Sequence, residues 1–153
     1  MLEKYLNHDM DNPDYLFHGS PLKLFELEPN ISHDSNQNMD NISNAIFLFP
    51  SLLKATPYAF KDIIKSNSEG LEWDFEIPNT NDYPLMIMKN VNIEDHIKGY
   101  IYVFQKDSSM IKDEDTYQYK CYHNLKPIDI IEVEYKDFKQ YFKVVNSENV
   151  KER

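Results

Sequence analysis

The apolar residues of the chain fall into short runs separated by polar segments that contain proline or glycine. Such runs are typical of β-strands, and alternation of apolar and polar residues marks a strand with one buried face. The pattern predicts about six strands, over residues 15–18, 45–49, 83–88, 99–105, 117–122 and 128–135. The polar segments 33–44 and 107–115 are predicted to be surface loops.

One helix is predicted between the second and third of these strands. Thr56 and Pro57 are the residue types that start helices, a capping hydroxyl followed by a proline at the first helical position. The helix would run over residues 57–66 and stop before Gly70, while Ser51 would cap no more than a short turn. Its inward or edge positions would be Tyr58, Phe60, Ile63 and Ile64.

The length of 153 residues fits a single domain, expected to span residues 1–153. Its core would cover about 14–142, with tails at 1–13 and 143–153, and a short second helix is predicted over 137–142. With 41% hydrophobic residues the chain can bury such a core. Several strands around one prominent helix place it in the α+β class.

Several kinds of site are excluded by composition. Cys121 is the only cysteine, which excludes an internal disulfide and a cysteine-based zinc site. The five histidines lack metal-ligand spacing. A calcium-like alternation over 34–40 has Met39 and Ala45 where glycine and glutamate are needed, so we expect no metal. No apolar run approaches the ~20 residues of a membrane span, and no signal peptide is visible, which predicts a cytoplasmic protein without a membrane partner.

The net charge of -10 argues against nucleic-acid binding, which needs a basic stripe. Solubility explains the acidity, and the alternative is a protein that mimics the charge of DNA or docks on a basic protein partner. Arg153 is the only arginine, so a bound phosphate would be held by lysines, backbone N–H groups or hydroxyls. Lys54 and Lys61, near the predicted helix, are candidates, although a solvated lysine is the simpler interpretation of each.

The candidate chemistry begins with His18, Gly19 and Ser20 at the end of the first strand. A histidine there can hydrogen-bond a ribose hydroxyl, and a glycine lets the backbone approach a flat ring and pair with its amide group. The serine hydroxyl adds a polar partner. A structural histidine at a strand–turn boundary is the competing interpretation of His18.

These residues resemble the ADP-ribosyltransferase superfamily in its His-Tyr-Glu branch, which includes poly-ADP-ribose polymerases. That family has a His-Gly-Ser/Thr strand, a second strand, a helix carrying a tyrosine and a later strand carrying a glutamate. Residues 45–47 take the second place, and Tyr58 follows Phe47 by 11 residues. Residues 125–128, Leu-Lys-Pro-Ile, fit the step before the last strand in related small bacterial proteins.

The resemblance covers roughly residues 15–135 and implies a split, mostly antiparallel β-sandwich that binds NAD+ or a related ADP-ribose nucleotide. It implies that His18 holds the adenosine-side ribose, that Gly19 meets the nicotinamide amide and that Tyr58 stacks on the nicotinamide ring. Ser20 and Phe47 would complete the nucleotide site. On pattern alone, a core aromatic on an amphipathic helix is the favoured interpretation of Tyr58.

The chain departs from the family at the position of the catalytic glutamate, which falls on Gln118. Glutamine can hydrogen-bond a ribose but supplies no negative charge to an oxocarbenium-like transition state. Glu114 or Asp115 could be the acid instead, and a solvent-facing strand residue is the plain interpretation of Gln118. Three hypotheses follow: a transferase that modifies an acceptor, a catalytically inactive module that senses or sequesters a nucleotide, and an acidic interaction or inhibitor protein.

Overall fold

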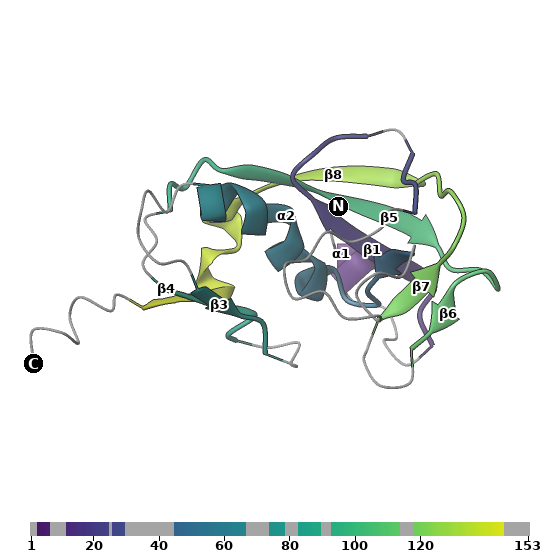
Figure 1. The fold of residues 1–153 in the computed structure, drawn as a ribbon, viewed down its shortest axis with the longest axis horizontal. Helices are drawn as coiled ribbons and strands as arrows, with labels where there is room; N and C mark the ends of the chain where they lie inside the picture. The colour runs from purple at the N-terminus through teal and green to yellow at the C-terminus, as the bar shows by residue number, and fades with distance from the viewer. Residues whose placement is uncertain are drawn as a thin grey trace, which may run out of the picture.

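The computed structural model describes residues 3–6, 12–24, 26–29, 45–66, 74–78, 83–89, 93–113 and 118–145. These residues form a mixed α+β structure whose strands are mostly antiparallel and which contains one main helix (Figure 1). The predicted α+β class is therefore confirmed. The predicted loop 33–44 with its calcium-like positions, Gly70, Glu114, Asp115 and Arg153 lie outside the described residues.

A three-stranded antiparallel sheet occupies the centre of the molecule. Its order is β1 (Tyr15–Ser20), β5 (Lys98–Gln105) and β8 (Asp129–Glu134). Neighbouring residues of β1 enter different apolar clusters, Leu16 on one face and Phe17 on the other. Both faces of this sheet are therefore covered, which explains why β5 is almost continuously apolar.

Two smaller sheets lie at opposite ends of the molecule, with the main helix between them (Figure 1). One contains β2 (Ile46–Leu48), β7 (Tyr119–Cys121) and β6 (Ile111–Lys112), all antiparallel. The other contains β3 (Asp74–Glu76), β4 (Met86–Lys89) and β9 (Phe142–Val145), in which β4 and β9 are parallel. A pair of 2.8 Å backbone hydrogen bonds between Phe17 and Phe49 joins β1 to the chain just after β2.

The main helix, α2 (Leu52–Ser66), begins before the predicted Thr56–Pro57 start, so that prediction is wrong. Ser51 is its cap, because its hydroxyl accepts the Lys54 N–H at 3.2 Å. Pro57 lies inside the helix and cannot donate to the Leu53 carbonyl. The Thr56 hydroxyl donates to that carbonyl instead, at 2.7 Å, which explains how the helix continues through the proline.

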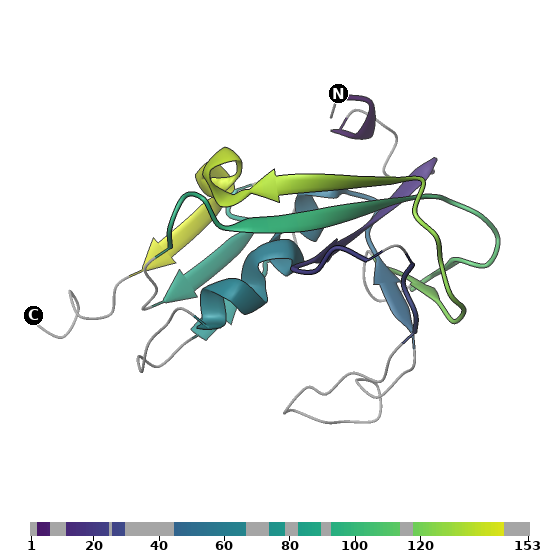
Figure 2. The same ribbon diagram turned by 90° about the horizontal axis from the view of Figure 1, so that it is seen from above.

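The helix packs against one face of the central sheet (Figure 2). The α2 backbone lies close to β1 and β5 because a glycine occupies each strand at the point where the helix crosses it. A Cβ added to Gly19 would lie 2.1 Å from the Ala55 carbonyl oxygen, and one added to Gly99 would lie 2.4 Å from the Ala59 carbonyl oxygen. Neither position can carry a side chain unless the helix moves away, since the obstructing atoms belong to its backbone.

Other boundaries also differ from the prediction. The short helix expected over 137–142 is replaced by two 3-10 turns, Tyr135–Asp137 and Lys139–Tyr141, followed by β9. Strand β9 carries the ordered structure past the predicted core limit of 142, and β6 lies in the predicted 107–115 loop. At the N-terminus, α1 (Glu3–Leu6) places Tyr5 in the core with 2% of its surface exposed.

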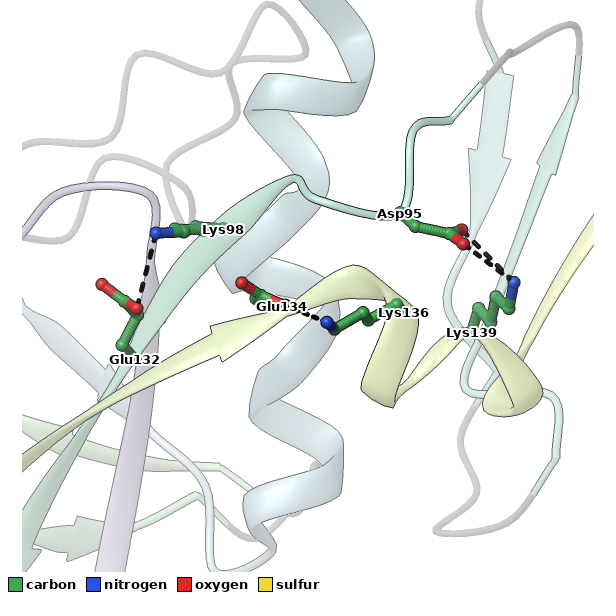
Figure 3. Close-up of polar contacts among 6 residues, drawn as sticks. All are labelled: Asp95, Lys98, Glu132, Glu134, Lys136 and Lys139. Atoms are coloured by element: carbon green, nitrogen blue, oxygen red, sulfur yellow. Dashed lines mark hydrogen bonds and ion pairs between the residues drawn. The ribbon is translucent and has the colours of Figure 1, made fainter.

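Strand β8 is an edge of the central sheet, and charged side chains lie along it. Lys98 of β5 pairs with Glu132 at 3.7 Å, and Lys136 pairs with Glu134 at 3.1 Å (Figure 3). Charges on an edge strand discourage pairing with a foreign strand. Within the described ranges, no helix is long and apolar enough to cross a membrane.

Candidate functional site

A cavity of about 300 Å³ opens where β1, β2 with the residue after it, α2 and the position before β7 meet. Its lining residues are His18, Gly19, Phe47, Phe49, Tyr58 and Gln118. Five of these six are residues that the sequence pattern singled out, and they come from β1, β2, α2 and the position before β7. Phe49 was not predicted, although its place two residues after Phe47 puts both side chains on the same side of an extended chain.

His18 is fixed by a hydrogen bond across the neighbouring strands. Its Nδ1 lies 2.8 Å from the Phe47 carbonyl oxygen, which can only accept, so Nδ1 carries the proton. Burial of the ring lowers the pKa of His18, and the hydrogen bond to Phe47 opposes this shift in part. The ring is therefore neutral near pH 7, and Nε2 has a lone pair that can accept a hydrogen bond from a hydroxyl group.

Tyr58 and Phe49 form an aromatic wall of the cavity. Their rings are stacked, with centroids 5.1 Å apart and planes at 25°. Tyr58 is half-buried, and burial raises the pKa of its phenol, so the group stays neutral. A flat wall with a neutral hydroxyl suits a planar ring that carries polar groups.

Gly19 has a structural role that the sequence did not reveal. It lines the cavity, but the side of the residue that would carry a Cβ faces α2 at the Ala55 carbonyl. Helix packing alone therefore requires glycine here. The predicted approach of a ligand to the Gly19 backbone stays a prediction.

Gln118 reaches the cavity from the position directly before β7. Its carbonyl oxygen accepts the Asp113 N–H at 2.9 Å, which joins the residue after β6 to the residue before β7. Among the described lining residues there is no carboxylate, so Gln118 supplies an amide where the resemblance expects an acid. The alternative acids, Glu114 and Asp115, lie outside the described residues.

Ser20 lies in a second cavity of about 290 Å³ and is absent from the described lining of the first. Its hydroxyl accepts the Leu22 N–H at 3.1 Å, which holds the turn after β1. The two cavities share His18 and Phe47, which therefore form their common wall. Leu24 and Leu27 give the second cavity a largely apolar lining.

The two lysines considered for phosphate binding have different environments. Lys54 is buried, its Nζ donates to the Pro78 carbonyl oxygen at 2.5 Å, and burial lowers its pKa. It therefore ties α2 to the chain after β3. The Nζ of Lys61 lies 5.3 Å from the centroid of the Tyr58 ring, close to the cavity.

Among the described residues, no group of three or more His, Cys, Asp or Glu side chains could hold a metal ion. Neither a known protein family, nor a curated protein, nor a solved structure matches the chain.

Proposed function

We propose that the chain is an ADP-ribosyltransferase-like protein that binds NAD+ or a related ADP-ribose nucleotide in the cavity at His18. The observation that carries the proposal is the convergence of His18, Gly19, Phe47, Tyr58 and Gln118 on one cavity. Packing of α2 against the sheet does not by itself require Tyr58 to share a cavity with His18 and Gln118. We also propose that the strands form the split sandwich of this family.

The cavity offers the contacts that a ring attached to a ribose needs. Tyr58 and Phe49 provide the stacking surface, Gln118 provides an amide donor and acceptor, and Nε2 of His18 accepts from a hydroxyl. At about 300 Å³ the cavity is at the small end of ligand sites, and suits one ring-and-ribose half of a dinucleotide. His18 stands in the wall shared with the second cavity, which suits contact with the ribose of the other half.

Transfer would break the bond between the ribose and the nicotinamide nitrogen, and the bonding electrons would leave with nicotinamide. An acceptor nucleophile, on a protein or a nucleic acid, would then bond to the ribose carbon and release a proton. The cationic sugar in between needs nearby negative charge. Gln118 carries none, so we favour the inactive module, which binds the nucleotide without turning it over.

Binding is tested by calorimetry with NAD+ and ADP-ribose on wild type and on Tyr58 variants. Tyr58→Ala should weaken binding by about 1–3 kcal/mol because a stacking surface is lost, whereas Tyr58→Phe keeps the ring and should bind nearly as wild type. Tyr122→Ala, which removes an exposed tyrosine outside the described lining of both cavities, is the matched control. Absence of binding by wild type would remove the nucleotide models and leave the acidic interaction protein.

Turnover is tested by nicotinamide release from NAD+ with protein and nucleic-acid acceptors. An inactive module predicts no release by wild type, and release by Gln118→Glu if only the charge is missing. Gln118→Ala, which removes the amide without adding a carboxylate, is the control. Release by wild type would instead establish the transferase.

A further inference from the structure

Two lysine ammonium groups lie over aromatic rings of the first cavity. Nζ of Lys61, on α2, is 5.3 Å from the Tyr58 ring centroid, and Nζ of Lys120, on β7, is 5.7 Å from the Phe47 ring centroid. Both lysines are half-buried. An ammonium group at this distance from a ring is attracted to the ring face, which holds a flexible side chain in place.

Both cations lie at rings that line the cavity, one at Tyr58 and one at Phe47. Phe47 and Phe49 project to the same side of their extended segment because they are two residues apart. Phe49 stacks on Tyr58, over whose ring Lys61 lies, while Lys120 stands across the strand pair from Phe47. A ligand in contact with the Tyr58 and Phe47 rings would lie near both ammonium groups.

These two positive charges contrast with the acidic character of the rest of the chain. The whole chain carries a net charge of -10, which repels an anionic ligand. The described lining of the cavity contains no carboxylate, and Asp113, which pairs with Lys120 at 3.6 Å, lies beside it. An ammonium has three donors, so Lys120 can keep Asp113 and still meet a phosphate.

We propose that Lys61 and Lys120 are an anion-recognising pair that makes the cavity select phosphorylated nucleotides over their neutral nucleosides. The inference rests on the proposed function and adds the two residues responsible for that selection. It replaces Lys54, whose Nζ is held by the Pro78 carbonyl oxygen, in the role of phosphate partner. Because the contacts are ionic, binding of the phosphorylated ligand should weaken as salt rises, while binding of a neutral nucleoside should not.

The test compares ADP-ribose with adenosine and nicotinamide, which carry no phosphate. Lys61→Gln and Lys120→Gln should each weaken ADP-ribose binding by about 5-fold to 10-fold and leave the neutral ligands unchanged, as measured by calorimetry and NMR titration. Lys98→Gln is the matched control, because it also removes one positive charge but belongs to the Glu132 pair shown in Figure 3. It should change nothing beyond the small effect of net charge.

A variant with the opposite expected effect on affinity distinguishes a charge role of Lys120 from a packing role. Asp113→Asn removes the carboxylate beside Lys120 and should tighten ADP-ribose binding severalfold, with no effect on adenosine. A lysine that served only to cover the Phe47 ring would not produce this gain.

The possible results distinguish failure of the lysine pair from failure of nucleotide binding. The lysine pair is overturned if the lysine variants weaken the binding of adenosine and nicotinamide as much as that of ADP-ribose. It is also overturned if their effect on ADP-ribose binding is no larger than that of Lys98→Gln. In both cases the proposed nucleotide cavity is unaffected. Equal affinity of wild type for ADP-ribose and adenosine overturns the pair in the same way. If no ligand of either kind binds wild type, both proposals are overturned.

Discussion

At the scale of single residues, His18 links the cavity to the pH dependence of folding. Burial lowers its pKa in the folded protein below the usual 6.5, so the folded state disfavours the protonated ring. The unfolded chain then binds the extra proton between the two pKa values. The stabilisation from the neutral ring is complete above pH 6.5 and is lost as the pH falls toward the folded pKa.

We therefore expect the free energy of unfolding to drop below pH 6.5, by at most about 1.4 kcal/mol per pH unit from this residue. His18→Gln, which does not titrate, should flatten that slope in urea titrations between pH 5 and 7. Val144→Ala, at an exposed position that does not titrate, should keep the wild-type slope. Equal slopes for wild type and His18→Gln would show that the His18 ring is not buried as described.

The residues of the site could be predicted unevenly from the sequence. His18, Gly19, Phe47, Tyr58 and Gln118 were found because a motif order carries them, and the chain brings them together. Lys120 could not be found in this way. Its place beside Phe47 follows from the register of β2 with β7, and nothing local in the sequence encodes that pairing.

At the scale of elements, the position of α2 depends on the absence of two side chains. Gly19→Ala would place a methyl group 2.1 Å from the Ala55 carbonyl oxygen, and backbone atoms cannot turn aside as a side chain can. We expect a loss of about 3 kcal/mol or more in urea unfolding. Ser20→Ala, one residue along the same strand, should cost less than about 1 kcal/mol. Wild-type stability of Gly19→Ala would mean that α2 lies farther from β1.

Element boundaries were predicted correctly where the hydrophobic periodicity is strong. They were predicted wrongly where tertiary contacts set the boundary. The long β5 and β8 were placed within one residue at each end. The start of α2 was missed because Thr-Pro is a strong local signal, whereas burial of Leu52 and Ala55 against the sheet extends the helix upstream. Strands β3, β6 and β9 have two to four residues each, too few for a period to be visible.

At the scale of the whole molecule, the central sheet joins two apolar clusters. On β5, Ile101 and Val103 enter the cluster beneath α2, while Tyr102 and Phe104 enter the cluster that includes β2 and β7. Tyr102 also fixes the chain after β1, since its hydroxyl donates to the Leu22 carbonyl and accepts the Leu24 N–H. Both clusters pack on the same strand, β5. We therefore expect that loss of packing in one cluster also exposes the other cluster to solvent.

This coupling predicts that a destabilising substitution beneath α2 also raises the solvent accessibility of the Cys121 thiol on the other face of the sheet. Phe60 is fully buried among the rings of Tyr135, Phe138 and Phe142, and Phe60→Ala should cost about 3–5 kcal/mol. Cys121 is fully buried in the opposite cluster, so its labelling by a thiol reagent should quicken by the factor that corresponds to the same free energy.

Circular dichroism in urea gives the global value for comparison, and Val144→Ala, at an exposed position on β9, is the control that should move neither probe. If Phe60→Ala lowers global stability but leaves Cys121 labelling at the wild-type rate, the thiol is reached by a local opening. The two faces of the central sheet would then be separate cooperative units, and the cavity at His18 would lie on the boundary between them.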